Sequence, residues 1–357
     1  MIGGGKMRKI YLLLGSLGVF LVTVAYTFKP VSIVDTKNYK QTLSEYGFFE
    51  GKLADLKPVK GVIPYTLNTP LFSDYASKAR FVKIPNGKSA VYNDKEVLDF
   101  PVGTILIKNF FYPKDARKPQ KGRQMMETRL LIYENDGWVA LPYIWNEAQT
   151  EANLDVAGDS KKVSWRDAKG KKRKIEYLIP NMNQCKGCHE RGKKMVPIGP
   201  SARQLNGDFE YPSGKANQLL HWQKQGVLKH LPDLATIPRL PVWNDPATGS
   251  LEARARAWLD INCGHCHRPD GPANTSGLFL YIHEQNKTAL GIQKAPIAAG
   301  RAAGNLHYDI VPGKPQKSIL VYRMESTDPG IMMPEIARQL VHKEGLTLIK
   351  NWIKAMK

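Results

Sequence analysis

Two copies of the pattern Cys-x-x-Cys-His constrain this chain more than any other feature of its sequence. The first copy is Cys185-Lys-Gly-Cys188-His189, the second is Cys263-Gly-His-Cys266-His267, and together they contain all four cysteines. Two thiols about one helical turn apart can form thioether bonds to the two vinyl groups of a porphyrin. The histidine that follows them can then bind the iron as its proximal ligand. The pattern therefore predicts two covalently attached haem c groups, held by the cysteines and ligated by His189 and His267.

The four cysteines are also compatible with other sites. A tetrahedral zinc site needs both cysteine pairs close together in space, and we expect the long segment between them to keep them apart. A zinc site would also leave the two trailing histidines without a role. A thioredoxin-like dithiol needs a βαβ setting that the flanking residues lack, and pairs this close in sequence are poor disulfide staples. Haem attachment is the interpretation that accounts for all six residues.

The first 28 residues have the composition of a signal peptide or an N-terminal anchor. Lys6 and Lys9 lie in a basic segment that precedes an almost uninterrupted apolar run over residues 10–26, as in secretory signals. Ala25 is the candidate cleavage position, and without cleavage the run is just long enough to span a membrane. Covalent haem attachment in bacteria occurs outside the cytoplasm. We therefore expect a periplasmic protein, tethered to the inner membrane if the segment is retained.

The chain is strongly basic. Its 52 Lys and Arg residues against 32 Asp and Glu residues give a formal net charge of +20. Such a surface favours an acidic periplasmic or membrane-bound redox protein as partner, or an anionic membrane surface. Export argues against nucleic acid, the other usual partner of a basic protein. The densest basic run, residues 161–174, is typical of a solvated hairpin.

The sequence predicts an α+β multidomain chain that begins with a β-rich domain over residues 60–180. Short β-prone runs separated by Pro, Gly and Asn indicate a sandwich or a barrel-like sheet. Hairpin turns are expected at residues 135–137 and 167–171. The runs are Arg80–Ile84, Thr104–Lys108, Thr128–Tyr133, Val163–Trp165 and Ile175–Ile179. The lone acids Asp74, Glu127 and Glu147 are interpreted as surface or hydrogen-bonding residues rather than catalysts.

Mainly α-helical cytochrome c modules are expected after the β-rich domain. Residues 181–240 are the expected first haem module, with a helix over 214–225. The expected second module, residues 248–357, has the layout of a class I cytochrome c domain. One helix with Leu251, Ala255, Trp258 and Leu259 on one face runs into its cysteine motif, and a terminal helix carries Leu346, Ile349, Trp352, Ile353 and Met356.

Each iron needs a second axial ligand to stay six-coordinate during electron transfer. For the second haem the candidate is Met333, with Met332 as the alternative, because a methionine before a proline precedes the last helix. For the first haem His221 and Met195 are equal candidates and Met182 is a third. An open, five-coordinate iron is the remaining alternative.

With these motifs placed, the chain resembles an uncharacterised family of exported bacterial dihaem c-type cytochromes. The resemblance runs from about Tyr65 to the C-terminus. It implies a β-rich N-terminal domain fused to two haem modules, with the six motif residues as the haem site and Met333 as distal ligand. The matching segments are TPLFSDYASKARF, FPVGTILIKNF, ETRLLIY, YIWNEAQTEA, IPNMNQCKGCH, PIGPSARQLN, INCGHCH and MMPEIARQLVHKEG.

Three functions fit this reading. The leading one is electron transfer between periplasmic or membrane redox partners, so we expect an electron carrier rather than a catalyst. A dihaem peroxidase-type enzyme with an open first haem is one alternative. A docking and redox subunit of a larger oxidoreductase is the other.

Overall fold

The computed structural model describes residue 1 and residues 36–297, 299–336 and 338–357. The chain divides into two compact units, Met1–Tyr39 and Lys40–Lys357, and the second contains both cysteine motifs. The described part of the first unit includes a short 3-10 turn, η1 (Thr36–Asn38). Apart from residue 1, the predicted signal or anchor over residues 1–28 lies outside the described residues. None of the described helices has the length and apolar content needed to cross a membrane.

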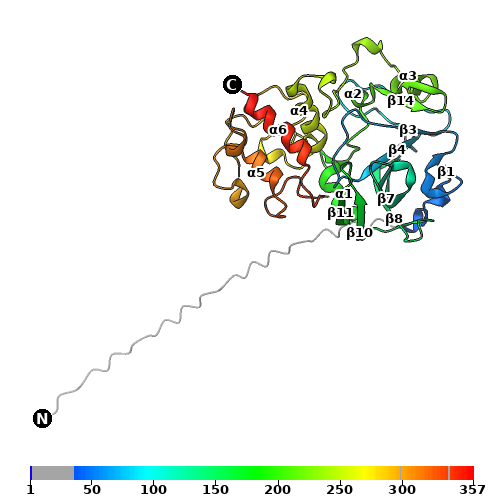
Figure 1. Cartoon of the computed structure of the whole chain (residues 1–357), viewed down its shortest axis with the longest axis horizontal. Coiled ribbons are helices and arrows are strands. Elements are labelled where there is room, and N and C mark those ends of the chain that lie inside the picture. The colour runs from blue at the N-terminus through cyan, green and yellow to red at the C-terminus, as the bar shows by residue number, and fades with distance from the viewer. Residues whose placement is uncertain (2–35, 298, 337) are drawn as a thin grey trace. The chain divides into compact units, whose positions relative to one another are not determined.

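A six-stranded antiparallel sheet is the largest element of the second unit (Figure 1). Its strand order is β3-β4-β6-β7-β8-β9, so neighbouring strands follow one another along the chain, with the short β5 (Ala90–Val91) paired elsewhere. Antiparallel neighbours can be joined by a tight turn, as β7 and β8 are, whereas the connection from β4 to β6 is long and includes β5. The strands are β3 (Val62–Tyr65), β4 (Ser77–Lys83), β6 (Ile105–Pro113), β7 (Arg123–Glu134), β8 (Gly137–Trp145) and β9 (Ala152–Leu154).

Both predicted hairpins are confirmed. Strands β7 and β8 are joined by two residues ahead of Gly137, whose φ of +124° lies in the region that favours glycine. Tyr133 pairs with Trp138 across this hairpin, and their rings stack with centroids 4.7 Å apart. The second hairpin joins β10 (Asp159–Arg166) to β11 (Lys172–Ile179). Its turn is held by the Asp167 carboxylate, which accepts hydrogen bonds from two backbone N–H groups of the loop.

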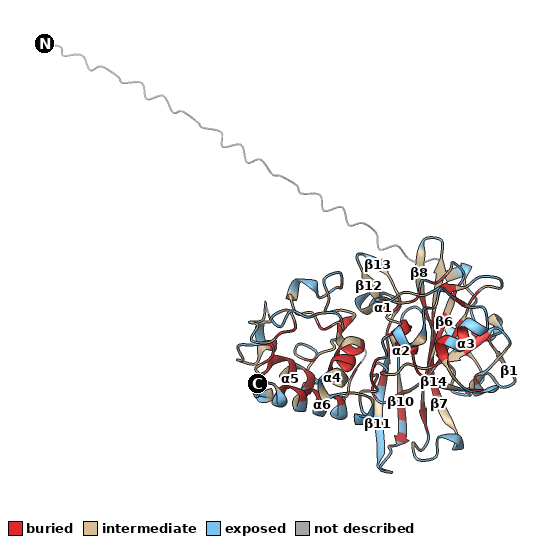
Figure 2. Ribbon diagram, turned by 90° about the horizontal axis from the view of Figure 1, so that it is seen from above, coloured by how far each residue is buried: buried red, intermediate tan, exposed pale blue. Residues whose placement is uncertain are grey.

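The two faces of the sheet differ in chemistry. On one face Phe81, Ile107 and Leu130 lie beside one another on β4, β6 and β7, and all three are buried. The other face carries apolar clusters toward its two ends and basic side chains between them. This alternation follows from the period of two in a β-strand. Figure 2 shows buried residues along the strands of the sheet.

The segment with the first motif combines short helices with two-stranded ribbons. Its longest helix has eight residues, and β16 pairs in parallel with the distant β5. The helices are α1 (Met182–His189), α2 (Ala202–Leu205) and α3 (Gln218–Lys224), and the strands are β12 (Glu190–Arg191), β13 (Lys194–Met195), β14 (Asp208–Tyr211), β15 (Gly214–Asn217) and β16 (Leu228–Lys229).

The C-terminal segment has a small helical core and long irregular connections. Helix α4 (Leu251–Leu259) starts at Ser250, whose hydroxyl accepts from the Ala253 N–H, and continues as a π-helical turn through Cys263. It shares a buried cluster with α5 (Ile319–Glu325) and α6 (Lys343–Ala355). The cluster contains the predicted apolar stripes of the first and last helices, so both helices are confirmed.

The expectation of mainly α-helical cytochrome c modules is wrong. The segment with the first motif has three short helices of 8, 4 and 7 residues among five short strands. The C-terminal segment has three α-helices of 9, 7 and 13 residues among turns and loops. Frequent Pro and Gly residues interrupt helical periodicity there. The predicted helix over 214–225 begins only at Gln218, because Asn217 caps it and the preceding residues form a strand. The predicted sandwich or barrel is one open sheet with small ribbons.

Candidate functional site

The first motif lies on helix α1, which the sequence starts with a reciprocal cap. The Asn181 side chain accepts from the Gln184 N–H at 2.8 Å, and the Gln184 side chain accepts from the Asn181 N–H at 2.9 Å. Cys185 and Cys188 then lie about one turn apart on this helix. Cys185 is 8% exposed, and burial raises the pKa of its thiol. The two thiols therefore have the helical spacing that the thioether pattern requires.

His189, at the end of α1, is fixed by the ribbon that follows. Its Nδ1 lies 2.9 Å from the Val196 carbonyl oxygen, and the Val196 N–H donates to the His189 carbonyl at 2.7 Å. Because a carbonyl oxygen can only accept, Nδ1 is the protonated nitrogen and Nε2 keeps its lone pair. Burial lowers the pKa of His189 to about 4. The imidazole is therefore neutral at physiological pH, with Nε2 available to a metal.

The second motif repeats this arrangement from a different element. It follows α4, and the His267 N–H donates to the Cys263 carbonyl at 2.9 Å. Nδ1 of His267 lies 3.2 Å from the Leu278 carbonyl oxygen, so this nitrogen also donates and Nε2 again is left as acceptor. Burial lowers the pKa of His267 to about 4. Both trailing histidines therefore have the same tautomer and the same kind of backbone partner.

A cavity of about 480 Å³ opens beside the second motif. Cavities of 300–1,000 Å³ are typical of small-molecule and cofactor sites. Much of the wall is apolar, which suits a planar hydrophobic ring, and the thiols and imidazole of the motif are part of it. The lining includes Cys263, Cys266, His267, Trp258, Leu278, Leu280, Ile319, Leu320, Met324 and Met333.

The structure separates the two methionines proposed for the second iron. Met333 lines the cavity together with His267, and its N–H donates to the Arg323 carbonyl at 3.1 Å. Met332 is 8% exposed and is not among the residues that line that cavity. These positions favour Met333 over Met332, and the ligand role of Met333 stays a prediction.

None of the candidates for the distal ligand of the first haem is favoured. Met195 is on β13 and directly precedes Val196, whose carbonyl oxygen binds the Nδ1 of His189, so the backbone approaches the ring here from the Nδ1 side. The His221 ring stacks on Tyr211 with centroids 3.5 Å apart, on a helix that Figures 1 and 2 draw apart from α1. Met182 opens α1, where its N–H donates to the Val156 carbonyl.

The two motifs meet in space. The ligand atoms of Cys188, His265 and Cys266 all lie within 4.8 Å of one another, and the Cys266 thiol donates to the Gly187 carbonyl at 3.4 Å. Hydrogen bonds from Cys266 and His265 lower the pKa of Cys188 to about 4. The expectation that the cysteine pairs lie apart is therefore wrong. Cys185 and Cys263 do not belong to the group, so the described residues form no four-cysteine site there.

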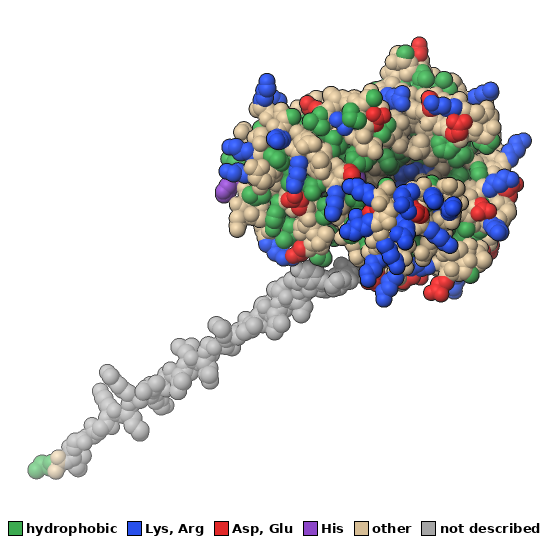
Figure 3. All heavy atoms as spheres, viewed as in Figure 1, with side chains coloured by type: hydrophobic (Ala, Val, Ile, Leu, Met, Phe, Trp, Pro, Cys, Tyr) green, Lys and Arg blue, Asp and Glu red, His purple; other side chains and the backbone are tan. Residues whose placement is uncertain are grey.

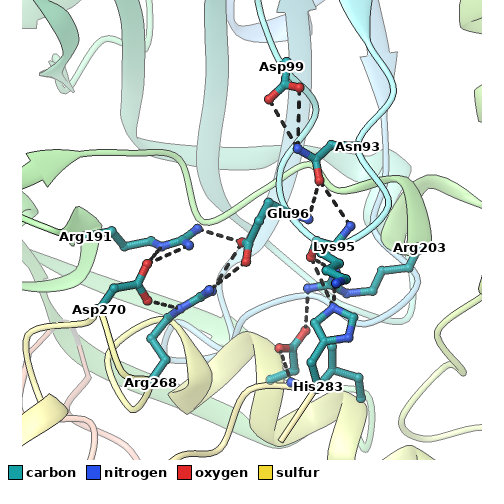
Figure 4. Close-up of polar contacts among 11 residues, drawn as sticks. Asn93, Lys95, Glu96, Asp99, Arg191, Arg203, Arg268, Asp270 and His283 are labelled. Atoms are coloured by element: carbon teal, nitrogen blue, oxygen red, sulfur yellow. Dashed lines mark hydrogen bonds and ion pairs between the residues drawn. The ribbon is translucent and has the colours of Figure 1, made fainter. Parts of the chain in front are cut away.

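A ring of ion pairs joins the segments that follow the two histidines (Figure 4). Glu96 binds Arg191 and Arg268, each at 2.7 Å, and Asp270 binds the same two arginines at 2.9 and 2.6 Å. Arg191 lies two residues after His189, and Arg268 directly follows His267. Although burial opposes it, the two guanidinium groups lower the pKa of Glu96. The ring holds both motifs in one fixed arrangement.

No sequence pattern predicted this ring, because Glu96 lies 95 residues from Arg191 and 172 from Arg268. The weak available indication was that each motif is closely followed by an arginine.

Known proteins give this chain no family. Searches of protein-family models, of curated proteins and of solved structures find no match. The function must therefore be inferred from the residues of the site.

Proposed function

We propose that the chain is an exported dihaem c-type cytochrome that carries electrons between redox partners of the periplasm or the membrane. The observation that carries this proposal is the shared state of His189 and His267. Each donates its Nδ1–H to a backbone carbonyl and keeps Nε2 as an acceptor next to a pair of cysteines. Such second-shell bonds fix the tautomer and ring orientation of histidines that ligate metals. The same tautomer in two different local structures is the state that a common metal-bearing ligand would require.

The residues around the second motif fit a haem. Cys263 and Cys266 would form the thioether bonds, His267 would hold the iron, and Met333 on the same cavity wall would supply the distal sulfur. The group itself would supply reversible one-electron chemistry at iron. The apolar side chains Leu280, Ile319 and Leu320 of the wall would exclude water from the ring.

The first motif offers the same pair of thiols and the same following histidine, but it has no assigned distal ligand. Cys185 and Cys188 would bind the ring and His189 would hold the iron, with the distal position unassigned. Since Cys188 and Cys266 meet, the attached edges of the two groups would adjoin at this point. Electrons would then pass between them without a long gap, which suits a carrier with one entry and one exit.

Charge on the surface supports docking to an acidic partner. Lys and Arg side chains gather over β10 and β11 (Figure 3), the hairpin predicted from the basic run. Opposite charge on a redox protein, or on an anionic membrane surface, would speed the encounter. The β-rich part would then serve as the docking element of the carrier.

A second candidate follows from the cluster of Cys188, His265 and Cys266. Two thiols and an imidazole within 4.8 Å can bind a thiophilic metal ion such as Zn²⁺. This candidate uses neither Cys185 nor Cys263, and it leaves both trailing histidines without a role.

Single cysteine variants separate the two candidates. The chain is expressed with the machinery for periplasmic haem attachment, and haem is detected by staining after a denaturing gel. Cys185→Ser and Cys263→Ser each remove a thiol that would bind haem and that lies outside the metal cluster. Each variant should therefore show reduced or no covalent haem. Zinc binding at the metal cluster should not change in either variant. Bound zinc in the wild type without haem staining would contradict the cytochrome proposal.

Spectroscopic redox titration then tests electron carriage. Two haems that take up and release single electrons, and that ignore carbon monoxide and peroxide, are expected. Rapid ligand binding at one haem with turnover of peroxide would indicate a peroxidase-type enzyme instead.

A further inference from the structure

Three basic residues face one another across neighbouring strands of the large sheet. Arg80 on β4 pairs in register with Lys108 on β6, and Lys108 pairs with Arg129 on β7. One step along, Lys78 pairs with Phe110 on the same face. Like charges placed directly opposite each other destabilise a sheet. We call Lys78, Arg80, Lys108 and Arg129 the cationic row.

The row surrounds an aromatic ring and includes buried charge. The Lys108 ammonium lies 4.8 Å from the centroid of Phe110, the Arg129 guanidinium 4.5 Å and the Lys78 ammonium 5.9 Å. Arg80 is only 7% exposed. Contacts with the ring face recover part of the lost hydration of these cations. They do not replace a counter-ion.

Acidic groups near the row are too few to neutralise it. Arg129 is paired with the buried Glu127 at 2.6 Å, which also accepts from the Tyr177 hydroxyl. Asp74 raises the pKa of Lys78 through its charge, although burial and the other cations lower that pKa well below its ordinary value. Among the described residues, Arg80 and Lys108 have no carboxylate within ion-pair distance. Arg129 is thus the one member of the row with an ion pair among the described residues, and Arg80 and Lys108 lack a partner.

Helix α1 packs against β8, the neighbour of the strand β7 that carries Arg129, so the row lies near the first cysteine motif. The pKa of Lys108 falls to about 7 through burial and the charges of Arg80 and Arg129, while the charges of Glu127 and Cys188 oppose that fall. Figure 3 shows a hollow over β4 and β7, with Lys and Arg atoms at its floor.

We propose that the cationic row binds a pair of carboxylates, and that these are the propionates of the haem attached at Cys185 and Cys188. This inference rests on the proposed function. Two carboxylates would give Arg80 and Lys108 the partners that they lack, and their charge would favour the protonated form of Lys108. Charge-assisted hydrogen bonds from Arg80 and Lys108 would replace water that burial has removed. Covalent attachment nearby would hold the carboxylates at a high effective concentration, which a free anion lacks.

The test compares the removal of a positive charge from the two faces of the six-stranded sheet. Lys108→Gln and Arg80→Gln each remove one cation from the row. Lys83→Gln is the matched control, because Lys83 lies on β4 with the opposite strand parity and contacts Phe48. Each holoprotein is titrated potentiometrically, and haem content is measured on the same samples.

Removing a nearby positive charge stabilises the oxidised iron. One of the two potentials should therefore fall in Lys108→Gln and Arg80→Gln, while the other potential and the control stay unchanged. If Lys108→Gln binds too little haem to titrate, Lys108→Arg decides, since it keeps the charge. Retention of both haems and both potentials in Lys108→Arg is expected, and loss of the first haem there would show a merely structural role.

Other results would overturn the inference. Unchanged potentials in both row variants would show that the row does not face the haem carboxylates. Saturable binding of inorganic phosphate to the wild-type holoprotein, lost in Lys108→Gln, would assign the row to a free anion. Absence of covalent haem in the wild type would instead refute the proposed function, whatever the row binds.

Discussion

The thiol sulfur atoms of Cys188 and Cys266 lie within 4.8 Å of each other. Each belongs to a different motif, one on α1 and one beyond α4, so elements far apart in the chain bring the second cysteines of the two pairs together. The ring of Glu96, Arg191, Asp270 and Arg268 fixes this approach. We therefore expect one paired redox centre rather than two isolated ones.

Optical coupling between the two haems is the first prediction. Adjoining rings in a fixed orientation should give a two-signed Soret band in circular dichroism. The double variant Cys263→Ser, Cys266→Ser would retain one haem and should give a single-signed band. A wild-type spectrum equal to the sum of the spectra of two single-haem variants would contradict close approach.

Replacement of Met333 by Ala should remove the methionine–iron charge-transfer band and lower one reduction potential. A thioether ligand raises the potential relative to other common ligands, so its loss has the opposite effect. Met332→Ala is the matched control, because Met332 is a buried neighbour that is not among the residues lining the cavity. It should keep the band. An unchanged band in Met333→Ala would show that another residue binds the iron.

Glu96→Gln should destabilise the protein by about 1–2 kcal/mol, because it weakens charge-assisted bonds to both Arg191 and Arg268. We expect a destabilisation near the lower end of this range, because the Glu96 side chain is 35% exposed and solvent screens the ion pairs. Glu50→Gln is the control: Glu50 pairs with Lys57 in an exposed position. Urea unfolding of both variants measures the difference, and equal stabilities would contradict a role for the ring.

Acid should weaken the same ring. The pKa of Glu96 and that of Asp270 are both lowered in the folded protein, although burial opposes the shift. A lowered folded-state pKa gives stability above the unfolded value, and this stability is lost as the pH falls through the folded one. The free energy of unfolding of Glu96→Gln should therefore fall less than that of the wild type as the pH is lowered from 5 through the folded-state pKa values. Parallel pH profiles would show that Glu96 does not contribute.

The side chain of His342 should give the stability of the protein a second pH dependence, at higher pH than that of Glu96. It stacks on Phe72 with ring centroids 4.3 Å apart and accepts from the Trp258 indole N–H at 3.2 Å. Burial lowers its pKa from 6.5 to about 4. In this pH range the unfolded chain binds a proton at His342 that the folded chain does not bind. The free energy of unfolding should therefore fall as the pH drops from 6.5 toward 4, by up to about 3 kcal/mol.

The variant His342→Phe keeps the stacking and removes the titration, so its stability should change less over this pH range. His307→Phe, at an exposed position, is the control and should follow the wild type. Calorimetric unfolding at a series of pH values measures all three, and identical slopes would exclude His342 as the cause.

Local patterns in the sequence predicted local structure well. The turn at Gly137, the hairpin around Asp167 and the helix into Cys263 all depend on residues within a few positions of one another. The expected helical modules failed because apolar residues at helical spacing do not reveal how many loop residues lie between the helices. Gly214 showed this directly, since it begins a strand rather than a helix.

The arrangement of the site was beyond the sequence. Glu96 meets Arg191 and Arg268 only after the chain has folded, and Cys188 meets Cys266 in the same way. The cationic row was closer to prediction. Lys78 and Arg80 alternate along a strand, which places both on one face, and only the strand register shows that Lys108 lies opposite.

The intact mass of the chain, purified after expression with the machinery for periplasmic haem attachment, tests the central claim most directly. Two covalently attached haems should add the mass of two haem groups to the polypeptide. Peptide mapping should place one on Cys185 and Cys188 and the other on Cys263 and Cys266. A polypeptide mass without haem, with zinc bound to the native protein, would contradict the account.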